Sequence, residues 1–137
     1  MNKDLTKIIY QYKNKEFSYE NHWHCSIFCA KVIEEFTGKE IPGWKEKAEL
    51  INDWPSAAKI LKSLGGKSIR DVPSIFLGAD KKKDISEAKR GEPVCYINED
   101  GEEILGICNG QRAYFLTESQ GLTARNIEDC ECCWSIK

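Results

Sequence analysis

The spacing of the apolar residues changes at Gly91, and this change limits the possible folds more than any other feature of the chain. Before Gly91, apolar residues recur every three or four positions, which is typical of amphipathic helices. After Gly91, short apolar runs alternate with turn-forming dipeptides, which is typical of antiparallel strands. This order predicts the α+β class, with N-terminal helices packed on a C-terminal antiparallel β meander.

Two helices are predicted in the N-terminal part of the chain. The first spans about residues 4–14, where the apolar side chains form one stripe. The second begins at Cys25 and ends at Thr37-Gly38, because a glycine can adopt the left-handed conformation that commonly follows a helix.

A third helix is predicted from its end signals. Pro55 suits the first turn of a helix, and Gly65-Gly66 suits its C-terminal end. We expect Ala58, Leu61 and Leu64 to face the core, because they share the apolar side of this segment.

Strands are predicted after Gly91, over residues 94–98, 103–108, 113–116 and 132–136. The dipeptides Asp100-Gly101 and Asn109-Gly110 favour tight turns between the first three of them. If Asp100-Gly101 is a two-residue turn, Cys95 lies opposite Gly106. Cys95 and Cys108 are then expected on the same face of the sheet, as packing residues.

The size and charge of the chain exclude several classes of protein. Its 137 residues predict a single domain over 1–137. Twenty basic and 22 acidic side chains give a net charge of -2, so we expect no nucleic acid among its partners. No apolar stretch approaches the ~18 residues of a membrane span, and no signal peptide is expected.

Seven cysteines are many for this length, but the number is odd. Since no secretory signal is expected, we predict reduced thiols in place of a complete disulfide framework. Each cysteine is then a packing residue, a metal ligand or a nucleophile.

Cys25 is the first candidate for chemistry, because it stands where a loop enters the second predicted helix. The partial positive charge of a helix N-terminus lowers the pKa of a thiol, and the unpaired amides there can hold an oxyanion. A cysteine nucleophile needs this environment. The alternative is that Cys25 is the first core residue of the helix.

Three segments in order carry a resemblance to a known family. The first, His24–Ala30, contains a cysteine at a predicted helix start. The second, Gly91–Tyr96, leads into a predicted strand, and the third, Ile104–Gly110, reads Ile-Leu-Gly-Ile-Cys-Asn-Gly. In this order the chain resembles the NlpC-type papain-like cell-wall peptidases. The resemblance implies a papain-like fold in which N-terminal helices pack on an antiparallel sheet.

The resemblance is closer to a phage-encoded, tail-associated branch of this fold. The shared features are an aromatic loop, a helix end, a third helix, a basic turn, a strand, a Gly-Leu pair and a terminal tryptophan. They are Phe17 to Trp23, Thr37-Gly38, Ala58 to Gly65, Lys89-Arg90-Gly91, Leu105 to Gly110, Gly121-Leu122 and Trp134. They cover almost the whole chain, and the specificity lies in their order.

The resemblance places the nucleophile at Cys25 but leaves the general base without a match. The family has a histidine two residues before Gly106, where this chain has Ile104, and no histidine follows His24. An apolar side chain cannot accept a proton from the thiol. His24, which replaces the aspartate of the family, and His22 are the remaining candidates for a base.

A metal site is an alternative use of the same residues. His22, His24, Cys25 and Cys29 are four suitable donors within a short segment, and Cys130, Cys132 and Cys133 cluster near the other end. Their spacing matches no familiar zinc pattern. Zinc or an iron–sulfur cluster is the cofactor that this hypothesis requires, whereas buried thiols require none.

Three hypotheses for function follow. The first is a catalytically degenerate NlpC-like domain that acts as a structural or assembly component of a phage tail tip. It would bind other tail-tip proteins and be found in the virion tail, or in the host cytoplasm during assembly. The second is an active cysteine peptidase or amidase that acts on peptidoglycan peptides through Cys25. The third is a zinc- or iron–sulfur-binding module.

Overall fold

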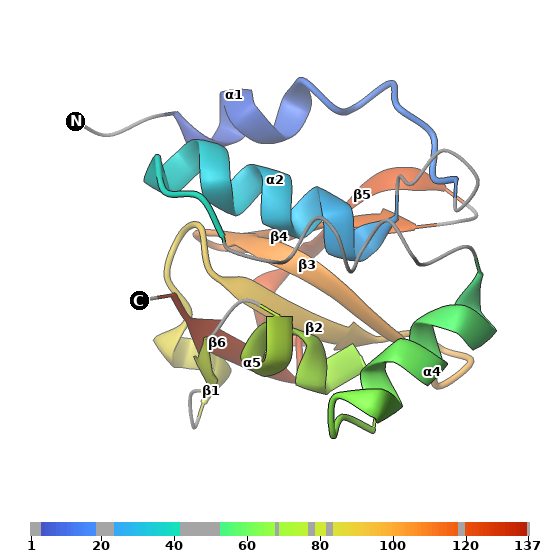
Figure 1. Ribbon diagram of the computed structural model, residues 1–137. Coiled ribbons are helices and arrows are strands. Elements are labelled where there is room, and N and C mark those ends of the chain that lie inside the picture. Colours follow the sequence, from blue (N-terminus) through green and yellow to red (C-terminus); the bar gives the residue numbers. More distant parts are fainter. Residues whose placement is uncertain are drawn as a thin grey trace.

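A mixed set of helices and one antiparallel sheet forms the molecule, as seen in a computed structural model (Figure 1). It describes residues 4–18, 24–41, 53–67, 69–76, 79–81, 84–117 and 120–136. The six strands lie in the order β1-β6-β2-β3-β4-β5, and neighbouring strands run antiparallel. They are β1 Asp80–Lys81, β2 Pro93–Ile97, β3 Glu103–Asn109, β4 Arg112–Thr117, β5 Gly121–Asn126 and β6 Cys132–Ser135. The predicted α+β class is confirmed.

The helices precede most of the strands in the chain. They are α1 Leu5–Tyr10, α2 Cys25–Thr37, α4 Trp54–Ser63 and α5 Val72–Phe76, with short 3-10 turns η1 Ile69–Asp71, η2 Ile85–Glu87 and η3 Ile127–Asp129. Helix α1 ends earlier than the predicted residue 14, and turns follow it. Helix α2 begins and ends where predicted, since Gly38 after its last turn has a φ of 72°.

Helix α4 begins with a reciprocal cap. The Asp53 carboxylate accepts a hydrogen bond from the Ser56 amide at 2.8 Å, and the Asp53 amide donates to the Ser56 hydroxyl at 3.1 Å. Leu61 faces the core as predicted, but Leu64 is 39% exposed. The prediction for Leu64 is wrong because the helix ends at Ser63, so the helical repeat no longer directs the next side chain inward.

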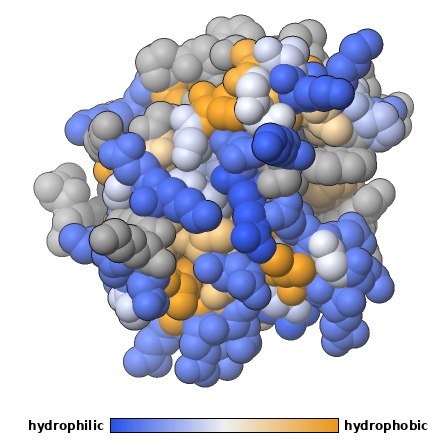
Figure 2. All heavy atoms as spheres, turned by 90° about the horizontal axis from the view of Figure 1, so that it is seen from below, coloured by the Kyte–Doolittle hydropathy of each residue, from blue (hydrophilic) through white to orange (hydrophobic). Residues whose placement is uncertain are grey.

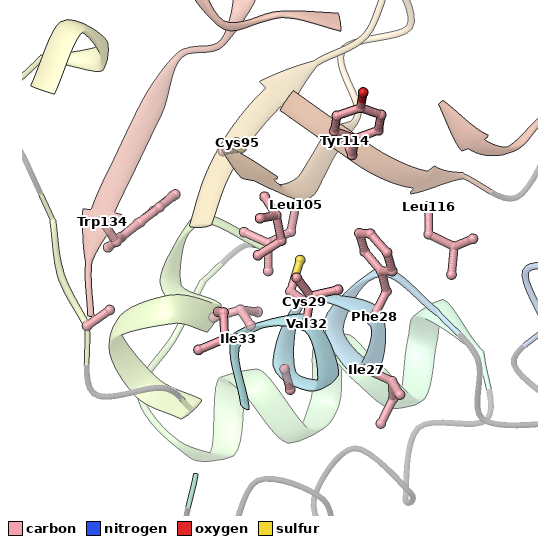
Figure 3. Packing of buried hydrophobic residues seen from close by; sticks show 14 of the residues in the cluster. Ile27, Phe28, Cys29, Val32, Ile33, Cys95, Leu105, Tyr114, Leu116 and Trp134 are labelled. Atoms are coloured by element: carbon pink, nitrogen blue, oxygen red, sulfur yellow. The ribbon is translucent and has the colours of Figure 1, made fainter. Parts of the chain in front are cut away.

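The two faces of the sheet are covered differently. The helix-side core joins the four helices to one face, and Figure 3 shows Phe28 and Cys29 of α2 pointing toward the strands. Its buried members are Leu5, Ile9, Ile27, Phe28, Cys29, Ala30, Val32, Ile33, Leu61, Val72, Ala79, Cys95, Leu105, Ile107, Tyr114, Leu116, Cys132 and Trp134. The turn-side cluster lies on the other face, under η2 and η3. Its buried members are Val94, Cys108, Ala113, Phe115, Cys130 and Cys133.

The hairpin between β2 and β3 differs from its predicted register by one residue. Cys95 lies opposite Leu105, not Gly106. The Asn98 amide donates to the Glu102 carbonyl at 3.0 Å, so the loop contains three residues. Gly101 adopts a φ of 80° in this loop, which is typical of three-residue hairpin loops. Because a one-residue shift reverses the face of every side chain, Cys95 and Cys108 lie on opposite faces and the expected shared face is wrong.

Two further features of the sheet were not predicted. Strand β5 follows β4 as another member of the meander, although its exposed second half has no apolar alternation to signal it. Strand β6 returns to the other side of the meander and pairs with both β1 and β2. The C-terminal strand therefore lies inside the sheet.

Figure 2 shows the face that lies below the view of Figure 1, where hydrophilic residues predominate and apolar residues form small separate patches. Among the described helices, none combines the length and apolar character that crossing a membrane requires.

Candidate functional site

Cys25 is the first residue of α2, as predicted, and His24 is its N-cap residue. His24 has an extended backbone, with φ -130° and ψ 176°, and its carbonyl accepts the first helical hydrogen bond from Phe28 at 3.0 Å. The His24 side chain makes no capping hydrogen bond, and the residue is 2% exposed. The helix that covers the sheet therefore begins at Cys25, directly after an extended His24.

The Cys25 thiol lies between α2 and strand β3. Solvent reaches part of the Cys25 residue, but protein groups enclose its thiol. Because burial removes water from the thiol, the pKa of Cys25 rises above its usual value. The backbone amide of Leu105, the Ser26 hydroxyl and the first amides of the helix favour the thiolate and lower the pKa in part. Desolvation is the larger effect, so the neutral thiol is the stable form at neutral pH.

Ile104, which stands where the resembled family has its general base, lies on the other face of the sheet from the Cys25 side. Ile104 packs against the turn-side cluster, whereas Leu105 belongs to the helix-side core. Alternation along β3 directs these neighbours to opposite faces. The chain thus lacks a proton acceptor at position 104, and the local geometry also directs that side chain away from the thiol.

Of the two histidine candidates, His24 lies next to Cys25 in the chain, at the buried start of α2. His22 lies outside the described residues. The groups found to influence the Cys25 thiol come from Ser26, Leu105 and the backbone of Cys25 itself.

Cys29 follows Cys25 by one helical turn and is fully buried in the helix-side core. Figure 3 shows its sulfur pointing from α2 toward the strand that carries Leu105. Desolvation raises the pKa of Cys29 well above the usual value, and the neighbouring Cys25 raises it further. These properties are those of a packing residue.

The predicted metal ligands do not assemble in the part of the chain that the structure describes. His24, Cys25 and Cys29 lie near the start of α2, but no group of three or more histidine, cysteine, aspartate or glutamate side chains suited to an ion occurs among the described residues. His22 lies outside the described residues, so the metal site stays a prediction.

The C-terminal cysteines are divided between the two faces of the sheet. Cys132 belongs to the helix-side core, whereas Cys130 and Cys133 belong to the turn-side cluster. Cys132 lies opposite Cys95 across β2 and β6. Sequence reasoning missed this pair, because the partners are distant in the chain and their pairing depends on where β6 enters the sheet.

Arg70 of η1 was also missed as a neighbour of the sheet. Its Nε atom lies 2.5 Å from Glu103 Oε2 at the start of β3, and both side chains are partly exposed. The pair lies close enough to the Cys95 and Cys132 thiols for their charges to interact. Residues 68–77 suggest a short helix that Pro73 weakens, and an isolated arginine in such a segment gives no local signal of this contact.

Comparison with known proteins identifies a family but no activity. No curated protein matches the chain by sequence. A family model matches residues 1–136, which is nearly the whole chain. The chain therefore belongs to the family described as Domain of unknown function (DUF6950).

Proposed function

We propose that the chain is a catalytically degenerate papain-like domain of the NlpC type that acts as a structural or assembly component of a phage tail tip. Its partners are then other tail-tip proteins, and its location is the virion tail, or the host cytoplasm during assembly. The tail context rests on the resemblance carried by the ordered motifs. The loss of catalysis rests on the surroundings of Cys25.

The observation that carries the proposal is the relation between Cys25 and strand β3. A cysteine peptidase needs a thiolate and a nearby base that accepts the thiol proton. Here desolvation favours the neutral thiol, and the residue at the expected base position packs on the opposite face of the sheet. Burial thus disfavours the thiolate, and position 104 supplies no base to it.

The overall arrangement supports the papain-like part of the proposal. A helix that begins with the candidate cysteine packs across an antiparallel sheet, and it contacts both β3 and β4. The strand beside the cysteine carries the Leu-Gly-Ile segment of the resemblance. This juxtaposition of helix start and strand is what the resemblance implies.

An active thiol peptidase or amidase is the second candidate, and one observation favours it. The helix amides, Ser26 and the Leu105 amide all favour the ionised form of Cys25. Such donors can also stabilise an oxyanion during attack on an amide bond. In this case the substrates would be peptidoglycan peptides.

A pair of assays distinguishes the two candidates. Purified chain is incubated with peptidoglycan and with synthetic stem peptides over a broad pH range, and released fragments are measured by mass spectrometry. In parallel, a phage that encodes the chain is tested with Cys25→Ala for particle assembly and infectivity. Cys25→Ser, which retains the size and polarity of the side chain, is the matched control for packing.

The proposal expects no Cys25-dependent fragments and normal assembly of particles that carry Cys25→Ala. Cleavage that is lost in both Cys25 variants would establish the enzyme instead. A loss of infectivity in both variants, with the protein folded and incorporated, would also count against a purely structural role.

A further inference from the structure

Cys95 and Cys132 lie directly opposite each other on the antiparallel strands β2 and β6. Both side chains belong to the helix-side core, so they occupy the same face of the sheet. Cys95 has no exposed surface, and Cys132 is 5% exposed. The Cys132 thiol lies close enough to Cys95 to influence its ionisation.

We propose that Cys95 and Cys132 form a reversible cross-strand disulfide that fastens β6 to β2. Directly opposed residues of an antiparallel pair have Cβ atoms about 4.5–5.5 Å apart. A disulfide needs about 3.5–4.5 Å between its Cβ atoms, so a closure of about 1 Å is enough. No rearrangement of the sheet is required.

The reaction needs an oxidant, and a low-molecular-weight disulfide such as oxidised glutathione is the class proposed. The Cys132 thiolate attacks one sulfur of the oxidant, which forms a mixed disulfide and releases the first reagent thiolate. The Cys95 thiolate then attacks the Cys132 sulfur, and the second reagent thiolate leaves. Two electrons pass from the protein to the oxidant, and the two thiol protons end on the two released reagent thiols.

Exposure sets the order of these steps. Cys132 is the member that solvent reaches, so we expect it to meet the oxidant first. Cys95 then needs no solvent access of its own, because it lies directly opposite Cys132 on the same face of the sheet. A buried second thiol is therefore compatible with the reaction.

The groups around Cys95 determine how fast the disulfide forms. Burial, the Cys132 thiol and Glu103 raise the pKa of Cys95 to about 12, whereas the Arg70 guanidinium lowers it. The thiolate is the attacking form, so closure is slow at neutral pH and accelerates as the pH rises. Arg70 favours the thiolate and Glu103, its partner at 2.5 Å, opposes it.

A disulfide at this place would restrain the C-terminal end of the chain. Strand β6 lies between β1 and β2 in the sheet. Because β1 has only 2 residues, β2 is the longer of the two strands beside β6. A covalent link between β2 and β6 limits the unfolded chain over the whole segment from Cys95 to Cys132. We expect oxidation to raise the melting temperature by roughly 10 °C.

The test uses the complete, folded chain. Reduced protein is incubated with oxidised glutathione at pH 8, free thiols are blocked with iodoacetamide, and the protein is digested without reduction by a protease that cleaves after glutamate. Cleavage after Glu87, Glu99 and Glu131 separates Cys95 from Cys108 and Cys130 from Cys132, whereas Pro93 protects the bond after Glu92. The proposal expects peptide 88–99 linked to peptide 132–137, by a bond that dithiothreitol breaks.

Cys133→Ser is the matched control, because Cys133 neighbours Cys132 in the chain but faces the other side of the sheet, opposite Val94. The crosslink is expected to persist in this variant and to vanish in Cys132→Ser. A crosslink that persists in Cys132→Ser would overturn the proposal. So would a disulfide that involves Cys130, or a wild-type protein whose Cys95 and Cys132 stay reduced until it is unfolded in urea.

Discussion

The backbone amide of Leu105 lies beside the Cys25 thiol, although the two residues belong to different layers of the fold. This contact joins the start of α2 to the middle of β3. It stabilises a thiolate in part, but desolvation of the enclosed sulfur is the larger effect and raises the pKa of Cys25. Cys25 therefore stands at a helix start, where the neutral thiol is favoured.

The reactivity of Cys25 should be low. We expect iodoacetamide to label Cys25 in the folded protein more slowly at pH 7 than in urea-unfolded protein, because the pKa is raised above the usual value. The measurement is site-resolved alkylation from pH 6 to 10, quantified by peptide mass. Rapid labelling of the native thiol near pH 6 would show that the thiolate is favoured and would support the active-peptidase candidate.

Placing a histidine at position 104 should not create a peptidase. Ile104 packs against the turn-side cluster, so the imidazole of Ile104→His would be directed away from Cys25. We expect peptide cleavage to stay at the level of Cys25→Ala when both variants are assayed with the same stem peptides. Cleavage that appears in Ile104→His and disappears in the double variant with Cys25→Ala would contradict this geometry.

Alkaline pH should destabilise the fold through its buried thiols. The pKa of Cys29 is raised, so its contribution to stability is complete below the unfolded value near 9 and is lost as the pH rises toward the folded value. A buried thiol of this kind lowers the free energy of unfolding by at most about 1.4 kcal/mol per pH unit. Urea unfolding between pH 8 and 11 measures the slope.

Cys29→Ala should reduce that alkaline slope, since it removes one titrating group. Val32→Ala is the control, because Val32 lies in the same helix and the same core but does not titrate. Both variants leave cavities and lose stability at pH 8. Equal slopes in the two variants would mean that Cys29 does not contribute to the pH dependence.

Gly106 should tolerate no side chain. A Cβ atom at this position would lie 2.4 Å from Phe115 Cδ1 and 2.5 Å from the Tyr114 carbonyl oxygen. We expect Gly106→Ala to lower the free energy of unfolding by about 2–3 kcal/mol, as overpacking does. Gly101→Ala is the control, because Gly101 has a φ of 80° but a Cβ atom there would meet no other atom within 4 Å. We expect it to lower the free energy of unfolding by about 1 kcal/mol. A smaller loss at Gly106 than at Gly101 would contradict this close approach.

The cap of α4 should contribute measurably to stability. Asp53→Ala removes the carboxylate that accepts the Ser56 amide, and we expect a loss of about 1 kcal/mol in the free energy of unfolding. Lys59→Ala, at an exposed site of the same helix, should change stability by less than about 0.5 kcal/mol. Chemical denaturation measures both, and equal effects would show that the capping box contributes nothing.

Local chemistry alone predicted much of the fold. The apolar stripe and Gly38 defined α2, and Pro55 with the glycines near residue 65 located α4. Strands β2, β3, β4 and β6 lie close to their predicted ranges. These features depend on the conformational preferences of neighbouring residues, which the order of amino acids determines directly.

Only the tertiary structure decided which side chains meet. Asn98 accepts hydrogen bonds from the Asp100 and Glu102 amides and holds a loop one residue longer than predicted, which sets the face of every residue in β2 relative to β3. The contact of Leu105 with Cys25 and the pairing of Cys95 with Cys132 follow from that register and from the place of β6. Their partners are far apart in the chain, so their positions depend on how whole elements pack, and no short segment of sequence contains that information.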